Sequence, residues 1–162
     1  MKKTITLENG QELVLDNNLG WLMEYQNQIG EDILPTLMPI ILSISDLIGG
    51  LAEAGVDLNK MTVNNFAEIL HSEAAMDAGV KLATFKTTDV INIIWAMAKA
   101  ADDNIDEPRK WIRQFDEGFP MDVILPEAAK LVVKGVLSSK NQTRLQENIK
   151  KLQPKSRKKK SK

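Results

Sequence analysis

The sequence predicts a mainly α-helical protein: a single helical domain of about five to seven helices, with a short N-terminal β-hairpin and a disordered basic C-terminal tail. Three observations predict it. Apolar residues recur at helical spacing over most of the chain, strict alternation occurs only near the N-terminus, and the last residues are nearly all basic. With 162 residues, 43% of them hydrophobic, the chain can bury one core but is short for two independent domains. We expect an acidic helical body over residues 1–152 and the disordered tail over residues 153–162.

The β-hairpin is predicted over about residues 4–15, where four apolar residues share odd numbers: Ile5, Leu7, Leu13 and Leu15. A two-residue Asn9-Gly10 turn would place Ile5 and Leu7 opposite even-numbered residues. A three-residue loop over residues 8–10, with Gly10 in the left-handed conformation, pairs residue 7 with 11 and residue 5 with 13. We favour this second register because it keeps the odd residues on one face. Since an isolated hairpin is marginal in water, that face should lie on the helical body.

Helices are expected from about residue 17 onward. The first would end at Gly30 and carry a stripe of residues at helical spacing: Leu19, Leu22, Met23, Gln26 and Ile29. A second would run over residues 34–54, with a kink or restart at Pro39. The longest apolar segment, residues 33–48, contains prolines, serines and Asp46 and falls short of the roughly 18–20 residues that span a bilayer. We therefore expect a core helix and no membrane segment.

The second half of the chain predicts further helices. One would run from Thr62 to about residue 75, with an interruption at residues 77–79, and another over residues 88–101. Asp106-Glu107-Pro108 is typical of a helix start, and the short helix after it would bury Trp111 before Gly118. An element over residues 119–136 would continue through Pro126, and residues 145–152 could form one more amphipathic helix.

The net charge of −1 hides two opposite regions. From Lys150 onward there are eight basic residues and no acidic one, so residues 1–149 carry a net charge of −9. The chain has no cysteine, which excludes a disulfide framework and thiolate metal sites and favours the cytoplasm. The N-terminus has no apolar stretch or cleavage site typical of a secretory signal.

Catalytic patterns are missing from the sequence. With a single histidine and no cysteine, there is no Cys-His pair and no multi-histidine metal site, and a Ser-His-Asp triad would depend on His71 alone. The carboxylates of residues 102–107 do not follow a calcium-loop spacing, and they are explained by a helix end followed by a helix start. We expect a non-enzymatic protein with no metal and no cofactor, which acts by binding other macromolecules.

The basic tail leaves three interpretations open: a contact with nucleic-acid phosphates, an arm for an acidic protein, or a solvated terminus. Its candidate contact residues are Lys155, Arg157, Lys158, Lys159 and Lys160. The acidic body would oppose an approach to DNA, and no aromatic residue between the lysines offers a stacking platform. A small nucleic-acid-associated protein therefore stays the alternative function.

Three segments carry a family resemblance: residues 93–102 (IIWAMAKAAD), residues 108–115 (PRKWIRQF) and residues 119–124 (FPMDVI). Together they resemble the tail assembly chaperones of long-tailed, siphovirus-type bacteriophages and prophages of Gram-positive bacteria. The similarity extends from Thr88 to Val136. It rests on packing residues and not on chemical groups: Trp95, Ala98, Trp111, Phe115, Phe119 and Pro120.

The resemblance implies a protein of the host cytoplasm that is absent from the mature virion. Such a chaperone binds the tape measure protein, keeps it soluble and promotes assembly of the tail tube around it. In many such phages a ribosomal frameshift gives a longer form that recruits the tail tube protein, and the lysine run 158–160 suggests codons on which a ribosome could slip. The wide apolar stripes of residues 34–54 and 88–101 could serve such a client or a homo-oligomer.

Overall fold

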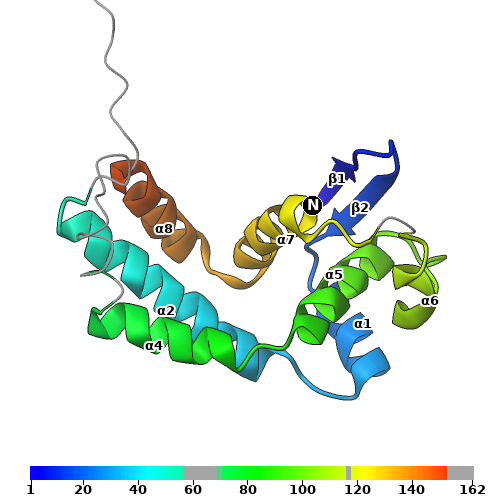
Figure 1. Ribbon diagram of the computed structural model, residues 1–162, viewed down its shortest axis with the longest axis horizontal. Helices are drawn as coiled ribbons and strands as arrows, with labels where there is room; N and C mark the ends of the chain where they lie inside the picture. Colours follow the sequence, from blue (N-terminus) through cyan, green and yellow to red (C-terminus); the bar gives the residue numbers. More distant parts are fainter. Residues whose placement is uncertain (57–68, 70, 116–117, 153–162) are drawn as a thin grey trace, which may run out of the picture. The chain divides into compact units, whose positions relative to one another are not determined.

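The computed structural model describes residues 1–56, 69, 71–115 and 118–152 (Figure 1). In this part of the chain it contains one two-stranded sheet and seven helices, which confirms the mainly helical fold and the N-terminal hairpin. The elements are β1 (Lys2–Thr6), β2 (Glu12–Asp16), α1 (Gly20–Ile29), α2 (Leu34–Glu53), α4 (Glu73–Ala83), α5 (Thr87–Ala101), α6 (Pro108–Ile112), α7 (Met121–Val136) and α8 (Ser139–Leu152).

The chain divides into two compact units. Unit 1 comprises Met1–Met38 and Phe85–Ser138, and unit 2 comprises Pro39–Thr84 and Ser139–Lys162. The tail, residues 153–162, lies outside the described residues, so its disorder stays a prediction. One body over residues 1–152 also stays a prediction.

The hairpin has the three-residue loop and the register favoured from the sequence. Ile5 pairs with Leu13 in antiparallel β1 and β2, and the Leu7 N–H donates to the carbonyl of Gln11 at 2.8 Å. Gly10 has φ +80°, a conformation that L side chains rarely adopt. The register therefore places all four odd-numbered apolar residues in the core: Ile5, Leu7, Leu13 and Leu15.

Unit 1 is built around α5, which packs against both β2 and α1. Six successive residues of α5, Ile93 to Ala98, are buried, so this helix has neighbours on more than one side. The stripe predicted for α1 is wrong: Trp21 and Tyr25 are buried, while Leu19 and Met23 are exposed. Both stripes have helical spacing, and the larger aromatic side chains occupy the core because they bury more area.

Helix α7 lies against the hairpin within unit 1. Its Glu127 forms an ion pair with Lys3 of β1 at 3.8 Å, and the Asn17 side chain donates to the carbonyl of Leu131 at 3.4 Å. A Cβ at Gly135 would be 2.8 Å from the backbone oxygen of Asn17, so only glycine allows this close approach. The helix continues through Pro126, as predicted.

Unit 2 contains most of α2 together with α4 and α8. Helix α2 continues through Pro39 without a restart. The predicted interruption at residues 77–79 is wrong, because α4 runs without a break from Glu73 to Ala83. Its start is fixed by Ser72, whose hydroxyl accepts the Ala75 N–H at 3.2 Å. Most of the helix predicted from Thr62 lies outside the described residues.

A polar cluster of three side chains joins α2 and α4. The Ser43 hydroxyl donates to the Asp77 carboxylate at 2.9 Å, and the Lys81 ammonium donates to both, each at 2.7 Å. The hydrogen bond from Lys81 and then that from Ser43 lower the pKa of Asp77. Ser43 is buried, so this cluster satisfies a polar group that interrupts the apolar face of α2.

Helix α2 is the one described helix long and apolar enough to cross a membrane. Over 18 residues its mean hydropathy is 1.6, and 28% of that window is buried. The core helix of a soluble protein passes the same test. The expectation that α2 is a core helix and not a membrane segment therefore stays a prediction.

Candidate functional site

Three aromatic side chains form a cluster where α6 leads toward α7 in unit 1. Trp111 meets Phe115 with ring centroids 5.2 Å apart and Phe119 at 5.6 Å, and the two phenylalanines are 4.9 Å apart. All three pairs are edge-to-face, the arrangement that aromatic rings favour. Trp111 and Phe115 are buried, whereas Phe119 and Pro120 are half-buried and reach the surface.

The remaining residues of the resemblance, Trp95 and Ala98, are both buried in α5. The Trp95 indole N–H donates to the carbonyl of Asp106 at 2.8 Å, which joins α5 to the segment leading into α6. The structure thus places Trp95 and Ala98 in the core, and only the Phe119–Pro120 end of the set at the surface. Lys155, Arg157, Lys158, Lys159 and Lys160 lie outside the described residues.

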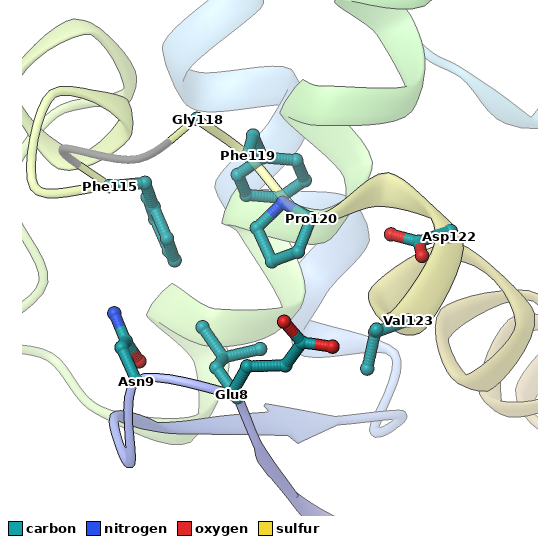
Figure 2. Close-up of a pocket in the computed structure, with 9 residues that line it drawn as sticks. Glu8, Asn9, Phe115, Gly118, Phe119, Pro120, Asp122 and Val123 are labelled. Atoms are coloured by element: carbon teal, nitrogen blue, oxygen red, sulfur yellow. The ribbon is translucent and has the colours of Figure 1, made fainter.

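A hollow of about 240 Å³, named here the hairpin pocket, opens beside the aromatic cluster (Figure 2). Residues 7–9 at the hairpin loop form one side, and Phe115 together with residues of the range 118–123 forms the other. Its lining residues are Leu7, Glu8, Asn9, Phe115, Gly118, Phe119, Pro120, Asp122 and Val123. Sequence reasoning missed this pocket because its two sides are more than 100 residues apart in the chain.

The hairpin pocket combines apolar walls with an acidic edge. Figure 2 shows the carboxylates of Glu8 and Asp122 on the same side of the pocket, both directed toward the gap between Pro120 and Val123. Both acidic residues are exposed, and none of the nine lining residues carries a positive charge. The arrangement therefore suits a cation that also has an apolar portion.

Exposed apolar residues form a second kind of surface. Leu19 precedes α1 and Met23 follows one turn later, with exposed fractions of 58% and 67%. On α4 of unit 2, Met76 and Val80 have the same spacing and exposed fractions of 55% and 68%. Residues four apart lie on one face of a helix, so each pair forms a small apolar patch.

The titratable groups of the described residues that stand out contribute to turns and packing. His71 is exposed, and no group of three or more histidine, aspartate or glutamate side chains there could hold a metal ion. Hydrogen bonds from Asn104 lower the pKa of Asp102 and close the turn after α5, which agrees with a helix end. Burial, with smaller effects of Asp89 and Glu31, raises the pKa of Tyr25 to about 12 and keeps its phenol neutral.

These groups supply packing, turns and helix ends, whereas the hairpin pocket and the apolar patches have surfaces that could bind another molecule. The Ser43–Asp77–Lys81 cluster could not be found from sequence, although a serine within an apolar run was a signal for a buried partner. No family model, curated protein or solved structure matches this chain.

Proposed function

We propose that this protein is a non-catalytic phage tail assembly chaperone, which binds the tape measure protein in the host cytoplasm and promotes tail tube assembly. The family resemblance of residues 88–136 motivates the proposal. The observation that carries it is the set of exposed apolar patches, Leu19 with Met23 on one unit and Met76 with Val80 on the other.

A chaperone for a long helical client needs apolar surface that stays accessible in the folded protein. An amphipathic client helix buries residues spaced three and four apart, and each patch presents two apolar side chains at that spacing. Methionine suits such a surface because its unbranched side chain adapts to different partners. One methionine lies in each patch, which supports binding of a client with a variable apolar sequence.

The proposal is tested by co-expression with a tape measure protein, which the proposal expects a neighbouring gene to encode. The wild-type chain should keep that client soluble and co-purify with it. A variant with Leu19→Ser and Met23→Gln, or one with Met76→Gln and Val80→Thr, should lose most of this effect without losing helix content. Gln26→Ala and Glu73→Ala, at exposed polar positions on α1 and α4, are matched controls that should retain it.

Unchanged client solubility in a variant that lacks both patches would contradict the proposal. A tape measure protein that stays soluble without this chain would contradict it as well. The first result would mean that the patches are not the binding surface. The second would mean that the client needs no chaperone, so the proposed function itself would be wrong.

A nucleic-acid-associated protein stays the second candidate because of charge in α8. Lys140, Arg144, Lys150 and Lys151 are exposed on this helix, and residues 139–162 contain ten basic residues and one acidic residue. Phosphate binding by such a segment should weaken steeply with salt. Deleting residues 154–162 should remove salt-sensitive DNA binding if this candidate is right, and should leave client solubilisation intact if the chaperone proposal is right.

A further inference from the structure

The hairpin pocket is lined by two acidic side chains and no basic one, whereas residues 150–162 have eight basic side chains and no acidic one. We propose that the hairpin pocket binds a lysine side chain from the basic segment, residues 150–162, of a second copy of this chain. This self-association goes beyond the proposed function and does not rest on it.

The chemistry of the pocket selects a lysine-like group. The ammonium would lie between the carboxylates of Glu8 and Asp122, where charge-assisted hydrogen bonds are strongest. The four-carbon stem would lie on the apolar wall of Phe119, Pro120 and Val123, which a small hydrated cation could not use.

The charge distribution of the whole chain favours the C-terminal segment as the occupant. Unit 1 contains nine basic and fifteen acidic residues, a net charge of −6. The segment from Lys150 to the end has eight basic residues and no acidic one. Complementary fields of this kind guide encounter between molecules before any short-range contact forms.

A second copy can supply this segment without a restriction on reach. Within one chain, the ten residues after Leu152 would span at most about 35 Å even when fully extended. A segment from another molecule has no such limit. Because the pocket and the segment are different surfaces, the contact is head-to-tail, and it permits chains of copies and not only closed dimers.

Zero-length cross-linking with a carbodiimide tests the contact on the full-length protein, because it joins a lysine amine to a carboxylate only when the two are in contact. An equal mixture of ¹⁵N-labelled and unlabelled protein distinguishes links between copies from links within one copy. We expect mixed-isotope links from the lysines of residues 150–162 to Glu8 or Asp122. Raising the salt concentration from 50 mM to 500 mM should reduce them several-fold, because screening weakens exposed ion pairs.

Substitutions locate the site. The double change Glu8→Gln and Asp122→Asn should abolish these links and weaken concentration-dependent self-association, measured by sedimentation, roughly five-fold for each carboxylate removed. Glu12→Gln with Asp103→Asn is the matched control, since both residues are exposed acidic residues of unit 1 outside the pocket. The control should behave as the wild type.

Three results would overturn the proposal. The first is a set of links spread evenly over the exposed carboxylates of unit 1, which would indicate unspecific attraction. The second is a set of links confined to one isotope, which would place the segment on its own chain. The third is self-association unchanged by Glu8→Gln with Asp122→Asn while the variant keeps the wild-type circular dichroism spectrum.

Discussion

The two units differ in how they use aromatic residues. Unit 1 contains all the buried aromatic side chains of the described residues: Trp21, Tyr25, Trp95, Trp111 and Phe115. In unit 2, α4 buries Ala78 and α8 buries Asn148 and Leu152, while Met76 and Val80 are exposed. Large buried rings stabilise a small core strongly, and helices that bury few side chains depend on a neighbour. We therefore expect the core of unit 1 to be the more stable one, while both units leave large apolar side chains exposed.

The largest expected loss of stability comes from a substitution in the aromatic cluster of unit 1. Trp111→Ala removes a buried ring that contacts two others and should lower the free energy of unfolding by about 3–5 kcal/mol. Met76→Ala, at an exposed position of unit 2, should change it by less than about 0.5 kcal/mol. Urea denaturation measures both values, and equal effects would refute the contrast between the units.

The same denaturation tests whether the units unfold together. All three tryptophans lie in unit 1, so their fluorescence reports on that unit alone, whereas circular dichroism at 222 nm reports on the helices of both. Coincident transitions would support a single cooperative body over residues 1–152, as the sequence predicted. A circular dichroism transition that begins at lower urea would show that unit 2 unfolds first.

A pair of glycines should give effects of opposite sign. Gly135→Ala in α7 would force its Cβ against the backbone of Asn17 and should destabilise unit 1 by about 1–3 kcal/mol. Gly79→Ala in α4 has no atom within 4 Å of its Cβ and should stabilise unit 2 by roughly 0.5–1 kcal/mol. Thermal denaturation of both variants tests the prediction. A loss of stability in Gly79→Ala would mean that α4 is covered there.

Acid should weaken both units, through different carboxylates. Burial of Asp16 opposes ionisation, but hydrogen bonds from the N-terminal ammonium and Asn18 outweigh it and lower its pKa below the usual 3.8. The resulting stability is present above pH 3.8 and is lost as the pH falls below it. Asp16→Asn should therefore flatten the pH dependence and cost about 1.5 kcal/mol at pH 7.

Asp77 provides the counterpart in unit 2, since its pKa is lowered in the same direction. Because Asp77 is exposed, Asp77→Asn should flatten the pH dependence less than Asp16→Asn. Unfolding measured between pH 2.5 and 7 for the two variants checks the order. A larger effect of Asp77→Asn would contradict the expectation that the more buried carboxylate contributes more to the pH dependence of stability.

The smallest expected effect on stability concerns the patch on α4. Met76→Gln with Val80→Thr should change the free energy of unfolding by less than about 0.5 kcal/mol, because both side chains are already in water. The same variant should lose client binding if the patch is a contact surface. A destabilisation above about 1 kcal/mol would show that the patch supports the fold and does not serve a partner.

Local patterns predicted much of this fold. The hairpin register followed from the odd-numbered apolar residues and Gly10, and the helix after Pro108 followed from its start signal. The face of α1 did not follow, because two stripes with the same spacing competed and only packing against α5 decided between them. The continuity of α4 through Gly79 likewise reflects context that overrides local propensity.

The candidate site was predictable only in part. Trp111, Phe115, Phe119 and Pro120 stood out in the sequence, but nothing in it joined them to Glu8 and Asn9. That contact is made by a hairpin loop folding onto a segment more than 100 residues later, and non-local contacts of this kind leave no periodic signal. The charge difference between the acidic body and the basic tail could be read from the sequence, whereas the pocket that could bind a basic side chain could not.

The loop of the hairpin has a consequence for how relatives of this chain can diverge. Its three residues set the register that buries Ile5 and Leu13, and they also carry Glu8 and Asn9 to the pocket. Inserting or deleting one residue would move the apolar side chains of one strand to the opposite face of the hairpin. The same change would displace the pocket wall. Evolution can therefore exchange side chains in this loop far more easily than it can alter its length, and an unvarying loop length among orthologues would be the expected mark of that double constraint.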